Sequence, residues 1–219
     1  MSNPPSVQRG RFVTFEGGEG VGKTTNIEFC AEWLCQRGIS VLTTREPGGT
    51  PIAELIRNKL LKAHHAEPMQ PITELLLMFA ARAQHVKAVI KPALDQGTWV
   101  LCDRFTDSTI AYQGFGRGLE LETIATLRDL AQEGLEPDMT MLLDAPVTVG
   151  MARARHRSLE TLEQTDRFEA EETAFFERVR DGFHALAATS PRFRRIDAER
   201  PIERVQQDIL LELSSLMPR

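Results

Sequence analysis

Short runs of apolar residues alternate along the chain with longer segments in which apolar residues recur every three or four positions. The short runs predict β-strands, and the longer spacing predicts amphipathic helices. We expect five strands, over residues 11–16, 39–44, 98–102, 139–143 and 193–196. Strands that alternate with helices favour right-handed βαβ units. The pattern therefore predicts an α/β fold with one parallel sheet of about five strands and helices on both faces.

Local end signals set the limits of the helices. Thr50 is a good N-cap and is followed by a proline at the first helical position, whereas Gly38 ends the first helix and Pro92 is expected to close the long one. The glycines between Gly114 and Gly118 predict a loop. The expected helices cover residues 23–36, 51–62, 72–90, 121–133, 147–157, 168–188 and 201–216.

The segment from Gly17 to Thr24 follows the first strand and opens the first helix. A glycine, four residues and then Gly-Lys-Thr form the pattern of a loop that cradles phosphates. Glycines let backbone N–H groups turn inward, and the helix N-terminus adds its positive end. A glycine-rich turn that only caps a helix is the alternative. The residues expected to bind nucleotide phosphates are Gly17, Gly18, Glu19, Gly20, Val21, Gly22, Lys23, Thr24 and Thr25.

Two oxygen-bearing residues predict a magnesium site beside this loop. Lys23 can reach the β- and γ-phosphates, and the Thr24 hydroxyl can ligate Mg²⁺. Asp103 follows the apolar strand 98–102, where phosphate-loop enzymes hold the same metal from the opposite side. A turn aspartate at the end of a strand is the alternative for Asp103 alone.

Composition and charge narrow the possible functions. The chain has 219 residues, of which 42% are hydrophobic, and a formal net charge of −5. This length suits one domain, and the negative charge argues against a general nucleic-acid or membrane-surface binder. No apolar run is long enough to span a membrane and residues 1–10 are polar, so we expect a cytoplasmic protein. Cys30, Cys35 and Cys102 have no paired spacing, which predicts buried or inert thiols in a reducing compartment.

Arginines gather near the carboxyl ends of the predicted strands, where ligands bind in parallel sheets. A second phosphate that faces the γ-phosphate needs bidentate cations, and Arg45, Arg57 and Arg104 are placed to supply them. Glu19 would repel phosphates, so we expect it to point away from them and accept a hydrogen bond from a sugar hydroxyl. Simple exposure to solvent is the alternative for Glu19.

Five segments in this order carry a family resemblance: Phe15 to Thr25, Thr44 to Thr50, Phe79 to Arg82, Asp103 to Phe105 and Ala111 to Gly114. Together they resemble the bacterial thymidylate kinases, and the similarity extends from Phe12 to about Leu210. The resemblance implies a three-layer phosphate-loop NTPase fold, transfer of the γ-phosphate of Mg-ATP to dTMP, and a homodimer. It also implies a single nucleoside monophosphate kinase domain over 1–219, with a mobile lid at about 150–168.

The resemblance also implies a dTMP site. Glu19 would take the 3′-hydroxyl, Arg82 the thymine O4, and Gln113 the base edge near N3, while Tyr112 would pack against the 2′ position. Glu46 would lie on the Mg²⁺ and acceptor side. The implied dTMP-binding residues are Glu19, Arg45, Arg57, Met78, Phe79, Arg82, Arg104, Ser108, Thr109, Tyr112 and Gln113. The family often has phenylalanine at position 78, so either Met78 or Phe79 covers the base.

The position of Gly20 points to the lid as the source of the catalytic cation. Other members of the family carry a basic residue there, whereas this chain resembles the type that uses lid arginines. Arg153, Arg155 and Arg157 precede Asp166-Arg167-Phe168-Glu169, and the segment between them, 158–165, is longer than this type leads us to expect. The alternative to a catalytic role is that these arginines form a solvated basic face of a helix. The implied catalytic residues are Lys23, Glu46, Arg104, Arg153, Arg155 and Arg157.

Two other functions stay open on the sequence. One is a phosphate-loop kinase with a different acceptor, and the other is a nucleotide-dependent switch or ATPase. Against the second, the chain has no Asn-Lys-x-Asp guanine-reading motif, and Asp103 is followed by Arg104 rather than by a catalytic glutamate. None of the five histidines has ligand spacing, so we expect none of them in the site.

Overall fold

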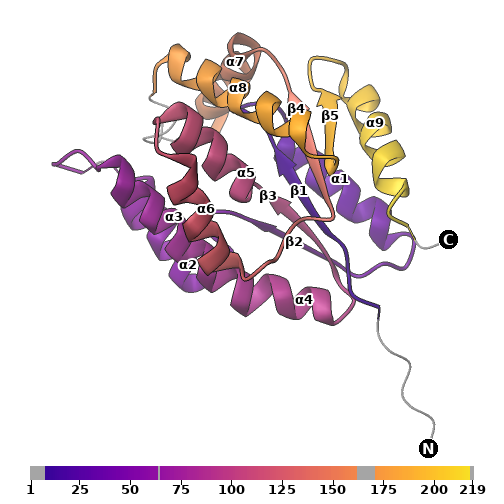
Figure 1. Cartoon of the computed structure of the whole chain (residues 1–219). Helices are drawn as coiled ribbons and strands as arrows, with labels where there is room; N and C mark the ends of the chain where they lie inside the picture. Colours follow the sequence, from indigo (N-terminus) through magenta and orange to yellow (C-terminus); the bar gives the residue numbers. More distant parts are fainter. Residues whose placement is uncertain (1–7, 64, 162–170, 218–219) are drawn as a thin grey trace, which may run out of the picture.

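The structure is a computed structural model that describes residues 8–63, 65–161 and 171–217, excepting the side chains of 157–161. Five parallel strands form one sheet in the order β2-β3-β1-β4-β5 (Figure 1). The strands are β1 (Phe12–Glu16), β2 (Val41–Arg45), β3 (Trp99–Asp103), β4 (Met139–Asp144) and β5 (Phe193–Asp197). Because Arg45 and Phe15 both pair with Asp103, the three neighbouring strands end at one level. The predicted parallel sheet is confirmed.

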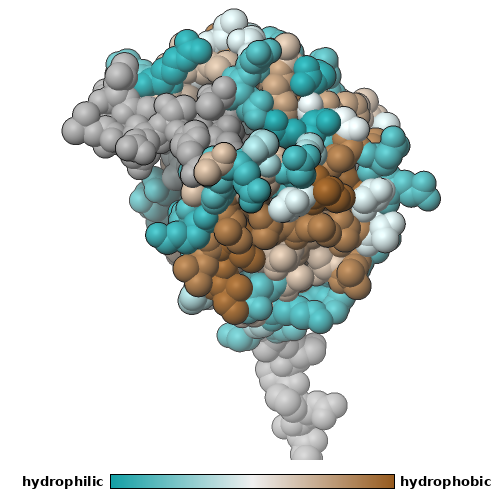
Figure 2. Space-filling view, turned by 90° about the vertical axis from the view of Figure 1, so that its left-hand side faces the viewer, coloured by the Kyte–Doolittle hydropathy of each residue, from teal (hydrophilic) through white to brown (hydrophobic). Residues whose placement is uncertain are grey.

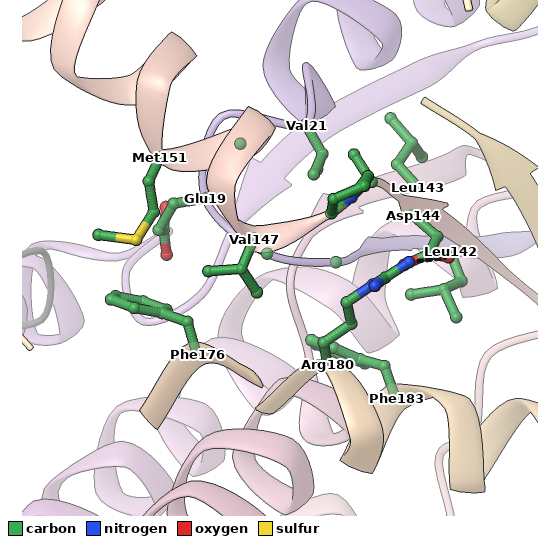
Figure 3. A pocket seen from close by; sticks show the side chains of 15 residues that line it. Glu19, Val21, Leu142, Leu143, Asp144, Val147, Met151, Phe176, Arg180 and Phe183 are labelled. Atoms are coloured by element: carbon green, nitrogen blue, oxygen red, sulfur yellow. Dashed lines mark hydrogen bonds and ion pairs between the residues drawn. The ribbon is translucent and has the colours of Figure 1, made fainter. Parts of the chain in front are cut away.

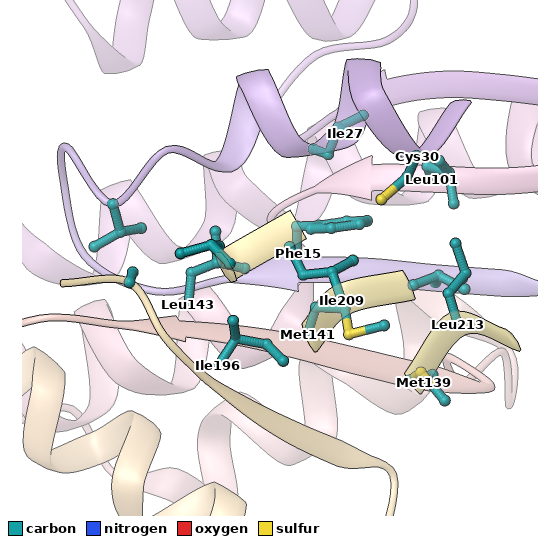
Figure 4. Close-up of a cluster of buried hydrophobic side chains, with 14 of the residues drawn as sticks. Phe15, Ile27, Cys30, Leu101, Met139, Met141, Leu143, Ile196, Ile209 and Leu213 are labelled. Atoms are coloured by element: carbon teal, nitrogen blue, oxygen red, sulfur yellow. The ribbon is translucent and has the colours of Figure 1, made fainter. Parts of the chain in front are cut away.

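Helices cover both faces of this sheet and make three layers (Figure 1). On one face, α1 and α9 pack on alternate strand residues such as Phe15 and Met141 (Figure 4). On the other face, Phe12, Val100 and Cys102 pack under η2 and α4. The helical segments are α1 (Lys23–Cys35), α2 (Pro51–Leu55), η1 (Ile56–Leu61), α3 (Pro71–His85), η2 (Val86–Ile90), α4 (Lys91–Asp95), α5 (Thr106–Thr109), η3 (Ile110–Gly116), α6 (Leu121–Gln132), α7 (Val147–Thr161), α8 (Thr173–Thr189) and α9 (Ile202–Ser214).

The expectation that Pro92 closes the long helix is wrong. The chain stays helical from Pro71 to Asp95 through the π-helical segment η2. α4 starts after that segment, so Pro92 lies in its first turn, where the missing N–H of a proline costs little. The Thr50 cap is confirmed, since its side chain accepts a hydrogen bond from the N–H of Ala53 at 3.1 Å.

The expected loop at Gly114–Gly118 is wrong in its first half, because η3 continues to Gly116. An ideal Cβ on Gly114 would lie 2.6 Å from Leu121 Cδ2, and one on Gly116 would lie 2.6 Å from Phe175 Cε2. These glycines therefore allow α6 and α8 to pack closely on a helix, rather than ending it.

One further expectation is corrected. The helix expected from residue 168 begins at Thr173, and residues 168–170 lie outside the described part. Of the thiols expected to be buried or inert, Cys30 and Cys102 are buried and Cys35 is exposed, so for Cys35 only the prediction of an inert thiol remains. No helix in the described ranges has the length and apolar character needed to cross a bilayer.

Candidate active site

A cavity of about 600 Å³ opens at the carboxyl ends of β1, β2 and β3. It joins the phosphate loop to the turn after β2, to α3 and to η3. The predicted dTMP-binding residues that line this cleft are Glu19, Arg45, Arg57, Met78, Arg82, Arg104, Ser108, Thr109, Tyr112 and Gln113. Residues from five separate segments of the sequence thus converge on one cleft.

Lys23 is buried at the start of α1, where the phosphate loop curls around it. Its Nζ donates to the carbonyl oxygens of Gly18 at 2.7 Å and Gly17 at 3.3 Å. Burial lowers the pKa of Lys23, and the nearby Arg104 lowers it further, so carboxylates at Glu19 and Asp103 are needed to favour the charged form. The lysine is therefore held in the loop by contacts that phosphate oxygens can replace.

Gly20 has a physical reason to lack a side chain. An ideal Cβ there would lie 1.9 Å from the carbonyl oxygen of Gly150 on α7, and its φ of +67° is in the left-handed region. In the same way, a Cβ on Gly150 would lie 2.3 Å from the carbonyl oxygen of Glu19. The loop backbone and the α7 backbone are in direct contact, which leaves no room for a basic side chain at position 20.

Thr24 and Asp103 lie together across the cleft, as the sequence predicts. The Thr24 hydroxyl is 3.4 Å from Asp103 Oδ2, and Asp103 Oδ1 is buried with no partner among the described residues. A hydroxyl and a carboxylate are oxygen ligands that suit Mg²⁺, which commonly takes one or two protein ligands plus phosphates and waters. The described residues contain no larger His, Cys, Asp or Glu cluster suited to a metal. The pair fits a magnesium ion held jointly with phosphates.

Arg104 projects from a strained turn into the wall between the phosphate loop and the rest of the cleft. Its φ is +64°, and its guanidinium donates to Gly17 O at 2.9 Å and to Glu19 Oε1 at 2.7 Å. The Tyr112 hydroxyl also donates to Glu19 Oε1, at 2.9 Å. Glu19 therefore points away from the loop toward this wall, and the alternative of a simply solvated side chain is wrong.

The buried carboxyl group of Glu16 holds the turn at Arg104 through hydrogen bonds to the residues that follow it. Glu16 Oε1 accepts from the N–H of Phe105 at 2.7 Å, and Ser108 Oγ lies 2.5 Å from Glu16 Oε2. Burial, followed by the nearby Asp107 charge, raises the pKa of Glu16 to about 8. Sequence analysis did not single out Glu16.

Glu46 and Arg82 form a buried ion pair with a third residue that the sequence did not predict. Arg82 Nε donates to Glu46 Oε2 at 2.6 Å, and its NH2 donates to Thr109 Oγ1 at 2.9 Å. His85, which is fully buried, lies with Nδ1 3.0 Å from Glu46 Oε1 and Nε2 2.8 Å from Thr44 Oγ1. The spacing of three between Arg82 and His85 places both on one helix face, which is the sequence signal for this contact. His85 does not line the cleft itself, but it contacts Glu46, which does.

The two candidates for covering a base occupy different places. Met78 lines the cleft. Phe79 packs in the core against Leu75 and Ile124, with the Arg82 guanidinium carbon 4.8 Å from its ring centre. The structure therefore places Met78 at the cleft wall and Phe79 behind Arg82.

Arg45 and Arg57 lie on the outer wall of the cleft. Arg45 is exposed and NH2 contacts both carboxylate oxygens of Glu54 at 3.1 Å. Arg57 NH1 donates to the carbonyl oxygen of Pro47 at 2.8 Å. Both arginines line the same cleft as Lys23. Their guanidinium groups are bonded to acceptors of the protein itself.

Two of the predicted lid arginines, Arg153 and Arg155, do not line this cleft. Arg153 NH1 donates to the carbonyl oxygen of Ala198 at 2.7 Å, and Arg155 is exposed. The side chain of Arg157 and the predicted lid segment 166–169 lie outside the described residues.

The base of α7 packs on the phosphate loop around a small pocket of about 20 Å³, large enough for about one water molecule (Figure 3). Val147 and Met151 of α7 face Phe176 of α8 across it. At its far side Asp144 accepts from Arg180 at 2.7 Å and Arg195 at 2.6 Å. Although burial opposes this, the pairing lowers the pKa of Asp144 to about 2. These ion pairs join the end of β4 to α8 and β5.

The phosphate loop opens onto an arginine-lined cleft at the carboxyl end of a parallel sheet. This arrangement places the chain among the phosphate-loop nucleotide kinases. The chain belongs to the thymidylate kinase family, whose family model matches residues 15–209.

Relatives match nearly the full chain. It is 56% identical over 206 residues to a thymidylate kinase of Chromohalobacter salexigens, a match that covers 94% of this chain and 95% of that protein. It is 55% identical over 211 residues to one of Pseudomonas fluorescens, covering 96% of each. The crystal structure of thymidylate kinase from Ehrlichia chaffeensis superposes with a TM-score of 0.74 at 36% identity, over 94% of this chain and 99% of that one.

Proposed function

We propose that the protein phosphorylates dTMP to dTDP with the γ-phosphate of Mg-ATP, a step toward dTTP. The observation that carries this proposal is the single cleft of about 600 Å³ that joins Lys23 to Arg82 and Gln113. Its volume accommodates a nucleotide. Family membership supports the choice of dTMP among nucleoside monophosphates.

The phosphate loop is the donor side. Gly17 to Thr25 would hold the phosphates of ATP, with Lys23 on the β- and γ-phosphates. Thr24 and Asp103 would hold Mg²⁺, which when bound neutralises charge on the phosphate oxygens. The acceptor phosphate is largely ionised near neutral pH, so no general base is required. This chain's own contribution is to position the two phosphates and to neutralise charge with Lys23, Arg104 and the lid arginines.

The opposite wall is the acceptor side. Arg45, Arg57 and Arg104 would take the dTMP phosphate, and Glu19 would accept from the 3′-hydroxyl. Arg82 would donate to O4 of the base, and Met78 would pack on its face as a thioether can. Ser108, Thr109 and Tyr112 would line the sugar and base. The buried Arg82 NH1, which has no partner among the described residues, supports a ligand acceptor at this place.

Glu46 has its carboxylate oxygens bonded to Arg82 and His85. We infer that it acts mainly by fixing Arg82, since both oxygens are engaged within a buried pair. A role at the Mg²⁺ would have to use the remaining lone pairs of these oxygens.

The proposed activity is tested with one coupled assay. The purified protein is mixed with ATP, Mg²⁺ and, in separate reactions, dTMP, dUMP, dCMP, dGMP, UMP or AMP, and formation of the diphosphate is measured. We expect the highest kcat/KM with dTMP. A higher value with another monophosphate would assign a different acceptor, and slow ATP hydrolysis that no monophosphate accelerates would favour an ATPase.

We also propose a homodimer formed through α2 and α3. These helices leave apolar side chains exposed, with Ile52 at 55% and Leu55 at 60% on α2, and Ile72 at 45% and Leu76 at 51% on α3. Figure 2 shows hydrophobic residues gathered into a band on the side of the molecule that carries these helices. A patch of this kind commonly marks a protein interface. Light scattering should give twice the mass of the 219-residue chain, and Leu76→Glu should give the monomer.

The remaining expectations concern the lid and the location of the enzyme. We propose one kinase domain over 1–219 with a lid at about 150–168 that brings arginines to the γ-phosphate. We place the enzyme in the cytoplasm, where ATP and dTMP are available to it.

A further inference from the structure

Gln113, the proposed reader of the base, is held by a buried carboxylate. Its Nε2 donates to Oε1 of Glu74 at 2.8 Å, and each of these residues is 1% exposed. An ionised carboxylate only accepts hydrogen bonds, whereas a carboxamide has one donating and one accepting end. The donating NH2 end of Gln113 must therefore face Glu74, because the opposite orientation would bring two acceptor oxygens together.

Arg117 forms an ion pair with Glu74. Its Nε lies 3.3 Å from Glu74 Oε1, and its NH2 lies 3.3 Å from Glu74 Oε2. The same guanidinium pairs through NH1 with Glu171 at 2.6 Å, and its carbon lies 4.8 Å from the centre of the Phe175 ring. Glu74 thus accepts hydrogen bonds from both Gln113 and Arg117, and the Arg117 guanidinium is itself held by a second carboxylate and an aromatic ring.

The orientation of Gln113 decides what the cleft presents to a base. With its NH2 group on Glu74, the side-chain oxygen is the end that remains for a ligand, and no donor among the described residues bonds to it. Gln113 and Arg82 line the same cleft. Arg82 NH1 is a buried donor that has no partner among the described residues. The wall thus offers one donor and one acceptor to a bound base.

We propose that Glu74 is a positioning residue that fixes the amide of Gln113 and thereby selects pyrimidines with an N3–H group. Thymine and uracil present a carbonyl oxygen at C4 and a donor at N3, which match this donor and acceptor. Cytosine presents an amino group at C4 and an acceptor at N3, which oppose both. The inference rests on the proposed role of Gln113 at the base edge.

Glu74→Gln tests the proposal with a side chain of the same shape. An amide at position 74 can accept or donate, so Gln113 is free to turn its NH2 group toward the cleft. We expect the ratio of kcat/KM for dTMP to that for dCMP to fall on the order of tenfold, the scale of leaving a buried polar group unpaired. Glu32→Gln, the same change at an exposed position on α1, is the matched control and should keep the ratio.

A double variant separates orientation from structure. In Glu74→Gln/Gln113→Glu the new amide donates to the new carboxylate, whose second oxygen faces the cleft as an acceptor. We expect the preference for dTMP over dCMP to return. A merely structural role would lower the melting temperature of Glu74→Gln without moving the ratio, and this result would overturn the inference.

Gln113→Leu distinguishes this inference from the proposed base contact. If Gln113→Leu leaves the ratio unchanged, Gln113 does not read the base and the underlying proposal fails. If Gln113→Leu lowers the ratio and Glu74→Gln does not, the base contact holds and only the role of Glu74 is overturned.

Discussion

The arginines that line the cleft and the arginines of the predicted lid differ in how their charged groups are held. On the acceptor side, Arg82 pairs with Glu46 and Arg104 with Glu19, at 2.6 and 2.7 Å. On the lid side, Arg153 bonds to a backbone carbonyl at Ala198 and Arg155 is exposed. Arg82 and Arg104 are therefore held by ion pairs at the cleft, whereas Arg153 and Arg155 do not line it, and we propose that they move to reach a transferring phosphate.

This difference has a physical basis. Buried charges are costly unless paired, so Arg82 and Arg104, which have little exposed surface, need carboxylate partners in the absence of a ligand. Preorganised groups in turn reduce the ordering cost of binding. A solvated cation gives up little interaction free energy when it moves. Solvated arginines therefore suit a lid that would close over ATP and exclude water. We therefore propose that the cleft arginines provide specificity and that the lid arginines contribute to catalysis.

The largest expected effect tests the donor side. Lys23→Ala should abolish phosphate transfer, a loss of roughly 10³-fold or more in kcat, because Lys23 neutralises charge on the ATP phosphates. Calorimetry should show dTMP binding nearly unchanged, because the residues proposed to bind dTMP, here called the acceptor wall, are held in place by contacts that do not involve Lys23. Lys59→Ala, at an exposed position on η1, is the control. Lost dTMP binding with intact ATP binding would mean that Lys23 belongs to the acceptor side.

The next prediction concerns the lid. Of Arg153, Arg155 and Arg157, the one that reaches the γ-phosphate should lower kcat by roughly 10³-fold when changed to Ala, by analogy with arginine fingers. The KM for dTMP should change little, because the acceptor wall does not include these residues. Rapid-quench kinetics on the three single variants measures the chemical step. Near-normal kcat in all three would remove the lid assignment and the contrast between the two sides.

The parts of the molecule that the sequence predicted depend on local chemistry. The loop from Gly17 to Thr24 is contiguous, and strand ends in a parallel sheet meet at one edge whatever the details of packing. Thr24 and Asp103 could therefore be paired across 79 residues of sequence.

The parts that it did not predict depend on packing between distant helices. Whether Met78 or Phe79 faces the cleft is decided by the neighbours of α3, and Phe79 is drawn into the core by Ile124 of α6. His85 and Glu74 act through contacts 39 residues away in the chain, with Glu46 and Gln113 respectively. For His85 the only local signal is its spacing of three from Arg82, and no local pattern distinguishes Glu74 from an ordinary polar position on a helix.

A smaller effect concerns the support of the acceptor wall. The pKa of Glu16 rises from 4.5 to about 8 in the folded protein, mainly through burial. The unfolded chain releases this proton above about pH 4.5 and the folded one keeps it until about pH 8, so stability falls across that window. Each pKa unit corresponds to about 1.4 kcal/mol. Glu16→Gln, which stays neutral, should flatten this decline and be more stable than the wild type at pH 8.5.

Urea unfolding at pH 5 and pH 8.5 measures this difference, with the exposed Glu28→Gln as control. Equal pH dependence in the wild type and Glu16→Gln would show that Glu16 is ionised throughout. The turn at Arg104 would then rest on a charged group, and the acceptor wall would be less stable at low pH than at neutral pH.

Tyr112 gives the smallest expected effect and the sharpest test of preorganisation. Its ring packs edge-on against Phe175 and Phe183, with ring centres 6.0 and 6.4 Å apart, and it also lines the cleft. Its hydroxyl donates to the side chain of Glu19, rather than to a backbone group as a purely structural tyrosine would. The ring is thus both part of the core and the wall where we propose that a ribose 2′-hydroxyl would project.

Tyr112→Ala should narrow the gap in kcat/KM between dTMP and its ribonucleotide by about 1–3 kcal/mol, the scale of a small group in a fitted pocket. It should also lower the melting temperature, because the ring is buried. Tyr112→Phe keeps the ring and removes only the bond to Glu19, so it should keep the sugar preference while weakening the fixed position of Glu19. A lower melting temperature with an unchanged ratio in Tyr112→Ala would show that the ring serves the core alone. In that case ribonucleotides are excluded without Tyr112, and Tyr112→Phe, which removes only part of what Tyr112→Ala removes, should leave the ratio unchanged as well.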